Sequence, residues 1–397
     1  MRVTDNVLRM AFLSALTQAQ QRIADTQNQV ATGRRVNLPS DDPFAAARIG
    51  ELDASLSRLE QYRSNGGLAV TRLGLEEETL VSVIDNLQRV RELAVQGNNA
   101  TLGDADRAAV ATEMRQRLDS VLALANASDQ NGHYMFSGYS ESTLPFAPGP
   151  GGVSYNGDEG QRHLQLSDER LVATNDAGSE VFQRIPNGNG TFVVRAAPSN
   201  TGAGVLGPAS ATDPSAFVPD TYAINFLSPA DYEIRDSGGG LVASGTYADG
   251  QAIAFLGVEV VLTGVPAAGD SFSVAPSSSQ DVFATLQAFI DALERPVTDQ
   301  ASRSLLHNDM GQGLVDIDQA VSHMIDVRAE IGARIRAIEQ EAALIDGFSL
   351  QLTESLSELR DLDYAEALSL LTSQLFGLEA AQQTFARTQG LSLFRYL

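Results

Sequence analysis

The feature that most constrains this chain is a run of mostly apolar residues that recur at alternating steps of three and four. The run is Met310, Leu314, Ile317, Val321, Met324, Arg328, Ile331, Ile335, Ile338, Ala342, Ile345, Ser349, Leu352, Leu356 and Leu359. A mean spacing of about 3.5 residues marks one seam of a helix that packs against another helix. At about 1.5 Å per residue such a helix is roughly 75 Å long. The sequence therefore predicts a long helix whose partner lies elsewhere in the same chain.

The amino-terminal arm also has apolar residues at helical steps, and two signals predict where its first helix stops. Gly33 is a typical helix terminator, and Pro39 pushes the residue before it into extended backbone. Ser40 or Asp41 is expected to be the N-cap of the next helix, with Pro43 in its first turn. That second helix is predicted to run to a turn near residue 97.

The carboxyl-terminal arm mirrors this arrangement. Residues 278–281 are a start signal for a short helix that Pro296 ends, and the long helix follows. The seam loses its register at 361–363 and resumes one residue out of step at Tyr364. Both ends of the chain are thus predicted to carry a separate helix beyond a longer inner bundle.

The segment 141–280 differs in kind from both arms. Residues 140–280 hold 11 of the 14 prolines and 19 of the 34 glycines, so long helices are excluded there. Short runs rich in β-branched and aromatic residues recur between turn signals and predict antiparallel strands. These runs are 152–155, 163–166, 191–194, 222–226 and 258–262.

The fold class predicted from these patterns is α+β. A long antiparallel helical bundle or coiled coil forms from both chain ends, and an antiparallel β domain is inserted in it. The expected domains are 1–42 with 361–397 (terminal coiled coil, the inner tube), 43–140 with 281–360 (helical core) and 141–280 (outer β-rich domain).

Composition argues against several functional classes. The chain has no cysteine and no lysine, which excludes disulfides, thiolate metal sites, Schiff bases and the P-loop lysine. Its formal charge of −23 disfavours nucleic acid as a partner. No apolar run reaches the roughly 18 residues of a membrane span. The four histidines are far apart, so no enzyme activity, metal or cofactor is expected.

Two local clusters can be interpreted either as binding sites or as ordinary structural features. Glu76, Glu77 and Glu78 could bind a cation, but a solvated helix face is the favoured interpretation. Tyrosines of the 141–280 segment could form a glycan-binding surface, although strand packing explains them as well.

Motifs at the predicted breaks resemble those of the flagellin superfamily. The stretch 33–37, GRRVN, followed by PSDDP at 39–43, resembles its amino-terminal motif in the form found in hook-associated proteins. LQRVRELAVQG at 87–97 and GHYMFSG at 132–138 are similar to its core, and DLDYAEAL at 361–368 to its carboxyl-side junction. The end, AAQQTFARTQGLSLFRYL at 380–397, resembles the hook-associated branch that acts at the hook–filament junction.

This resemblance implies that the terminal helices pair and stack with copies from neighbouring subunits. The residues expected at that subunit interface are Val7, Met10, Leu13, Leu16, Ile23, Val30, Leu368, Leu371, Leu375, Leu378, Phe385, Leu393, Phe394 and Leu397. The residues expected at the domain junction are Gly33, Asn37, Pro39, Asp41, Asp42, Pro43, Asp361, Asp363 and Tyr364. Isolated helices with a narrow apolar stripe are marginal, so we expect these tails to order fully only on assembly.

The resemblance also implies the partners and the location. The partners are hook-associated protein 1, flagellin, further copies in a ring, and a cytoplasmic export chaperone at the carboxyl-terminal helix. The first thirty residues lack the pattern of a Sec signal peptide, so export to the extracellular flagellum through the flagellar type III system is expected. Two alternatives remain: filament flagellin and, more distantly, a secreted coiled-coil adhesin or pore-forming translocator.

Overall fold

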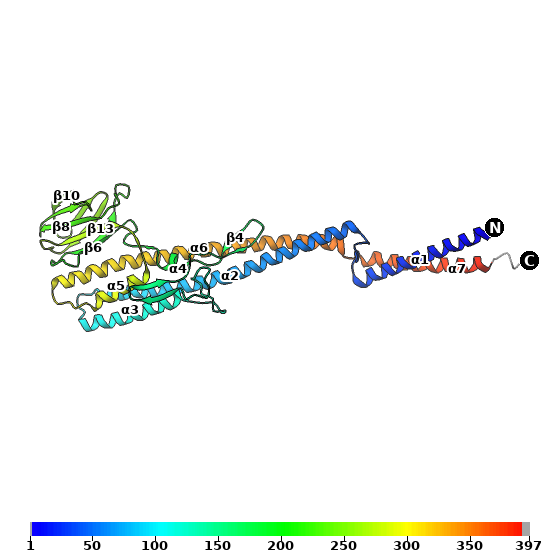
Figure 1. The fold of residues 1–397 in the computed structure, drawn as a ribbon, viewed down its shortest axis with the longest axis horizontal. Helices are drawn as coiled ribbons and strands as arrows, with labels where there is room; N and C mark the ends of the chain where they lie inside the picture. Colours follow the sequence, from blue (N-terminus) through cyan, green and yellow to red (C-terminus); the bar gives the residue numbers. More distant parts are fainter. Residues whose placement is uncertain (1, 391–397) are drawn as a thin grey trace, which may run out of the picture. The chain divides into compact units, whose positions relative to one another are not determined.

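The computed structural model describes residues 2–390, which fall into two compact units. One unit combines the chain up to Ser64 with the chain from Gln340 onward, and the other is Asn65–Glu339. The long helices are α1 (Arg2–Thr32), α2 (Pro43–Gly97), α3 (Asp104–Ala125), α5 (Val282–Glu294), α6 (Gln300–Arg360) and α7 (Tyr364–Gly390). The predicted breaks after Gly33 and at 361–363 are confirmed, and α2 and α6 each contribute to both units (Figure 1).

The N-cap of α2 differs from the prediction. Asp42, directly before Pro43, accepts a hydrogen bond from the backbone N–H of Ala45 at 3.0 Å, so Asp42 is the N-cap and neither Ser40 nor Asp41 is. The Asp41 carboxylate instead accepts hydrogen bonds from two backbone N–H groups of the preceding turn, 2.8 and 3.1 Å away. Because that carboxylate is occupied, the cap moves one residue along the chain.

The predicted seam is the buried stripe of α6. Every seam residue from Met310 to Leu359 is buried or half-buried, and Met310, Ile317, Met324 and Ile331 are fully inaccessible. Most apolar residues of α2 from Leu73 to Leu93 belong to the same core. The partner helix that the seam requires therefore lies in the same chain, as predicted.

Ion pairs also join α2 and α6. Within Asn65–Glu339, Glu77 pairs with Arg328 at 2.8 Å and Arg91 with Asp318 at 2.7 Å; within the other unit, Arg63 pairs with Asp346 at 3.2 Å. All are partly exposed, and such pairs contribute little stability, about 0–1 kcal/mol each. They favour one register of the two helices, while the apolar stripe supplies most of the stability.

Fourteen strands are described between α3 and α5, and all their pairings are antiparallel, as predicted. They are β1 (Phe146–Gly149), β2 (Gly152–Tyr155), β3 (His163–Gln165), β4 (Leu171–Ala173), β5 (Ile185–Pro186), β6 (Phe192–Ala196), β7 (Val205–Ala211), β8 (Tyr222–Ser228), β9 (Asp231–Arg235), β10 (Leu241–Thr246), β11 (Ala252–Phe255), β12 (Val258–Thr263), β13 (Ser271–Pro276) and β14 (Ser279–Gln280). A short helix, α4 (Gly178–Phe182), interrupts them. The largest sheet has the order β10-β9-β8-β13-β6, and a second has the order β11-β12-β7.

The residues of this segment belong to two separate apolar clusters. Phe146, Phe182 and Ile185 pack into the helical core with α2, α3, α5 and α6. Strands β6 to β13 enclose a second cluster, around Phe226 and Phe272. The part from 146 to 186 therefore covers the helices, while 192–276 is a β domain with a core of its own.

Glu76 does not lie on a solvated helix face, in contrast to the expectation from the sequence. Its side chain is 1% exposed, and one carboxylate oxygen accepts a hydrogen bond from the backbone N–H of Asp176 at 3.1 Å. The Asp176 carboxylate in turn pairs with Arg334 of α6 at 2.5 Å. The middle residue of the acidic triplet, Glu77, pairs with α6, and Glu78 is exposed. Helix α2 thus turns one of three successive glutamates into the core.

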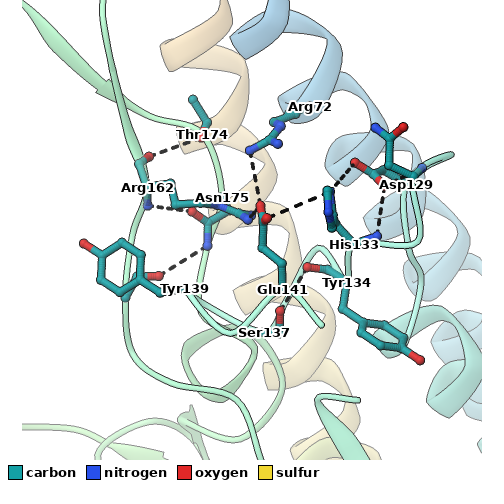
Figure 2. Close-up of polar contacts among 12 residues, drawn as sticks. Arg72, Asp129, His133, Tyr134, Ser137, Tyr139, Glu141, Arg162, Thr174 and Asn175 are labelled. Atoms are coloured by element: carbon teal, nitrogen blue, oxygen red, sulfur yellow. Dashed lines mark hydrogen bonds and ion pairs between the residues drawn. The ribbon is translucent and has the colours of Figure 1, made fainter. Parts of the chain in front are cut away.

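A polar cluster lies beside Glu76 and holds the segments 129–141 and 162–175 against α2 (Figure 2). The carboxylate of Glu141 pairs with Arg162 and lies 3.6 Å from the guanidinium of Arg72. The backbone of Arg162 donates to the Asn175 side chain at 2.7 Å. These contacts satisfy polar groups that the two segments bury as they cover the core.

Burial raises the pKa of Glu76 well above its ordinary value, and the nearby Asp176 carboxylate adds to the rise. The folded state therefore holds the proton over a pH range in which the unfolded chain has released it. The resulting stability is present in full below the unfolded pKa of about 4.5, and it is lost as the pH rises through the folded pKa.

We predict that Glu76→Gln removes this pH dependence. Because the amide cannot ionise, the variant should gain stability relative to the parent chain as pH rises above the unfolded pKa. Urea unfolding followed by circular dichroism at a series of pH values measures the effect. The exposed neighbour Glu78→Gln is the matched control and should follow the parent curve; an E76Q curve parallel to the parent at every pH would contradict the assignment.

Candidate functional site

Helices α1 and α7 form an antiparallel pair within one unit (Figure 1). Early residues of α1 meet late residues of α7: the rings of Phe12 and Phe385 stack with centroids 4.2 Å apart. Nearer the other end of the pair, the Thr26 hydroxyl donates to the side-chain oxygen of Gln374 at 3.1 Å. The two contacts fix the direction and the register of the pair.

The stripe between α1 and α7 contains only part of the predicted interface set. Leu16, Ile23 and Val30 of α1, and Leu371, Leu378 and Phe385 of α7, are buried or half-buried. The stripe also includes residues that the sequence analysis missed, namely Phe12, Ala19, Thr26, Ala367, Gln374 and Ala381. Together the α1 members follow steps of three and four from 12 to 30, a signal that the small Ala19 and the polar Thr26 obscure.

The other predicted interface residues face away from this stripe. Val7, Met10 and Leu13 of α1 are exposed, Met10 at 68%, and so are Leu368 and Leu375 of α7. Phe376, not in the predicted set, is 75% exposed. The predicted positions Leu393, Phe394 and Leu397 lie outside the described residues. The pair therefore carries large apolar side chains that its own packing leaves in water.

The junction begins at Gly33, whose left-handed backbone (φ +68°) ends α1. A Cβ at this position would lie 2.8 Å from the hydroxyl oxygen of Tyr364, so glycine suits both the backbone and the space. The carbonyl of Gly33 accepts from the N–H of Leu362 at 3.0 Å, and the N–H of Arg35 donates to the carbonyl of Arg360 at 2.7 Å. Two chain segments more than 300 residues apart are thereby joined backbone to backbone.

Four aspartates organise the turns on either side of this bridge. The Asp363 carboxylate accepts from the Ala365 N–H at 2.9 Å at the start of α7, as Asp42 does at the start of α2. Asp41 holds the turn at 37–38, and Asp361 accepts from the Ser357 hydroxyl at 2.7 Å. Hydrogen bonding from Ser357 lowers the pKa of Asp361. Asp42 and Asp363 thus cap the starts of α2 and α7, while Asp41 and Asp361 hold the segments that precede them.

The remaining junction predictions lie in the same turns. Asn37 accepts from the Thr32 hydroxyl at 2.9 Å, Pro39 lies in the turn before α2, and Pro43 is the first residue of α2. Arg35 was not predicted at the junction, yet its guanidinium donates to the Leu359 carbonyl at 2.9 and 3.2 Å. Its position in the GRRVN motif was the sequence signal that could have identified it as a junction residue.

A small cavity lies beside Glu76 in the described part of the chain. The cavity beside Glu76 has a volume of about 30 Å³, which is enough for a water molecule and too small for an organic substrate. Between residues 2 and 390 no group of three or more histidine and acidic side chains is arranged to hold a metal ion. None of the described helices is long and apolar enough to cross a membrane.

Comparison with known proteins places both arms in one superfamily. The bacterial flagellin N-terminal helical region matches residues 3–141, and the bacterial flagellin C-terminal helical region matches residues 314–397. Flagellar hook-associated protein 3 of Escherichia coli (strain K12) is 26% identical over 396 residues, covering 100% of this chain and 99% of that protein. Phase 1 flagellin of Salmonella naestved is 28% identical, but over only 33% of this chain and 26% of that protein.

Solved structures give the same assignment. The crystal structure of FlgL from Xanthomonas campestris is 36% identical, with a TM-score of 0.72 over 77% of this chain and 99% of that one. Flagellar hook-associated protein 3 from Legionella pneumophila is 33% identical, with a TM-score of 0.76 over 78% of this chain and 98% of that one. With helical arms, an inserted β domain and this similarity, the chain belongs to the FlgL family, the flagellar hook-associated protein 3 family.

Proposed function

We propose that this chain is the structural adaptor that joins the hook of the bacterial flagellum to its filament. A Legionella pneumophila relative, 33% identical to this chain, is described as the flagellar junction protein. The observation that carries the mechanism is the set of exposed apolar side chains on α1 and α7, outside the stripe that the two helices share. An adaptor of this kind acts by packing and needs no reactive group.

Assembly into a ring gives these side chains a place to pack. Burying one large apolar side chain contributes about 1.5–3 kcal/mol, while association costs several kcal/mol of translational and rotational freedom. A single contact cannot offset that cost, but Val7, Met10, Leu13, Leu375 and Phe376 together can. Copies of the pair stacked side by side would bury these residues in every subunit, which makes assembly cooperative.

The same surface defines the partners that we propose. Hook-associated protein 1 would meet one end of the ring, and flagellin, whose helical regions match both arms, would meet the other. Leu368, Leu375 and Phe376 of α7 are exposed in the single chain, which supports this helix as the proposed site for a cytoplasmic export chaperone. The chain would then reach the cell exterior through the flagellar type III system.

Filament flagellin is the nearer alternative, and the extent of the matches favours the adaptor. The hook-associated relative aligns over its whole length, whereas the Salmonella flagellin aligns over about a quarter of its own. A secreted adhesin or pore-forming translocator is the more distant alternative. Binding of the purified chain to glycans or liposomes would favour it.

Immunogold labelling of intact flagella tests the proposed function. Antibody against the β domain should label a single band where the hook meets the filament. Label along the whole filament would identify a flagellin instead. A strain that lacks the gene provides the control for background label.

Replacing Leu375 and Phe376 with alanine should block incorporation at the hook end without unfolding the monomer. Both side chains are exposed, so their loss changes monomer stability by no more than about 0.5 kcal/mol. Filament formation in a complementation assay, together with thermal unfolding, measures the two effects. Leu227→Ala removes an exposed leucine of the β domain and should assemble normally. Normal assembly of the double variant would contradict the packing mechanism.

Gly33→Ala should loosen the junction specifically. Left-handed backbone costs a residue with a side chain about 1–2 kcal/mol, and the added methyl group crowds Tyr364. Faster hydrogen exchange at 33–37 and 360–364, with unchanged exchange in Asn65–Glu339, is the expected result. Gly50→Ala, in an open position inside α2, is the matched control and should stabilise by about 0.5–1 kcal/mol. Equal exchange in both variants would refute this role of Gly33.

A further inference from the structure

The β domain of residues 192–276 is attached to the helices without sharing their apolar core. Among the described residues, the cluster around Phe226 and Phe272 and the cluster of the helical core have no member in common. The β domain can therefore stay folded when its position on the helices changes. What fixes that position must be found in the contacts between the two.

One attachment is a neck where the chain enters and leaves the domain. Strands β5 and β14 pair there, and Asn187 of the entering segment binds the leaving segment. Its side-chain oxygen accepts from the N–H of Ser278 at 3.0 Å, and its backbone carbonyl accepts from the Ser277 hydroxyl at 2.7 Å. The neck keeps the entering and leaving segments together. Because β5 and β14 pair through only two residues each, we expect the neck to act as a hinge.

Asn308 provides a second attachment away from the neck. It lies on α6, is 5% exposed, and forms two hydrogen bonds with the start of β7. Its side-chain oxygen accepts from the N–H of Leu206 at 2.6 Å, and its side-chain nitrogen donates to the carbonyl of Gly204 at 3.1 Å. Both partners are backbone groups, so a single amide holds the β7 backbone with a donor and an acceptor.

Asp316 provides a third attachment eight residues further along the same face of α6. It is 6% exposed, and its carboxylate accepts from the N–H of Gly188 at 2.8 Å and from the Gln312 side chain at 3.0 Å. Gly188 has φ +62°, and a Cβ there would lie 2.3 Å from the carbonyl oxygen of Phe192. The loop that leads into β6 is thus shaped to present its N–H to Asp316.

We propose that Asn308 and Asp316 form a latch that locks the β domain against α6, and that opening the latch lets the folded domain swing on its neck. The sheet containing β6, β8 and β13 lies next to the part of α6 that carries these residues (Figure 1). A latch made of polar groups can open because water replaces its hydrogen bonds. Separating an apolar interface would instead expose apolar surface to water, which is unfavourable. The inference does not depend on the proposed function.

Double electron–electron resonance on the full chain tests the latch. The chain has no cysteine, so Ser244→Cys on β10 and Ser322→Cys on α6 place two spin labels at exposed sites without interference. The parent chain should give one narrow distance distribution. Asn308→Ala combined with Asp316→Ala should give a broad one, with unchanged helix content and unchanged hydrogen exchange of the β-domain core.

Two comparisons make this result specific. Asp326→Ala with Gln340→Ala removes two exposed polar side chains of α6 and should keep the distribution narrow. Asp316→Asn alone retains an oxygen that can accept from Gly188 and should also keep it narrow. A narrow distribution in the double alanine variant would overturn the latch. Loss of helix content in that variant would overturn it too, because the residues would then support the helical core and not the attachment of the β domain.

Discussion

The apolar seam at a 3.5-residue step is the constraint on which the rest of the structure depends, because a helix with such a seam is stable only against a partner. Along α6 the inner part of the seam finds that partner in α2, and its residues are buried or half-buried. In the terminal pair the shared stripe is narrower and only half-buried at many positions, and large apolar side chains remain in water. One repeat therefore produces a self-sufficient core and an end that, in the function we propose, is completed by other chains.

Polar contacts determine geometry where apolar packing alone would leave it open. At the junction, backbone hydrogen bonds determine which segments meet, and Asp42 and Asp363 determine where α2 and α7 begin. At the β domain, Asn308 holds the backbone at the start of β7, and Asp316 holds the loop that leads into β6. Beside α2, the buried Glu76 accepts a hydrogen bond from the N–H of Asp176 and so positions the chain segment that covers the core there. Each of these hydrogen bonds is directional and so fixes an orientation, whereas burial of apolar surface is not directional.

Periodic and local features of the fold were predictable from the sequence, and contacts between distant residues were not. Steps of three and four, together with Gly33 and Pro43, predict the helices and their breaks, and the alternating strands predict the β insert. The N-cap of α2 was predicted one or two residues too early, because Asp41 and Asp42 are equivalent in sequence until the N–H groups of Asn37 and Leu38 donate to Asp41. Burial of Glu76 depends on Asp176 and Arg334, which lie 100 and 258 residues away along the sequence. In the candidate site, the predicted junction residues lie together. Half of the residues in the stripe between α1 and α7 were not predicted, because small and polar residues such as Ala19 and Thr26 interrupt its apolar pattern.

The central claim is that α1 and α7 are completed by neighbouring subunits. Hydrogen–deuterium exchange of the full chain, compared between the free protein and the protein assembled at hook ends, tests it most directly. The account predicts fast exchange of the amides of α1 and α7 in the free chain, and strong protection of the same amides after assembly, while α2 and α6 within Asn65–Glu339 are protected in both. Equal and strong protection of α1 and α7 in the free chain would contradict it.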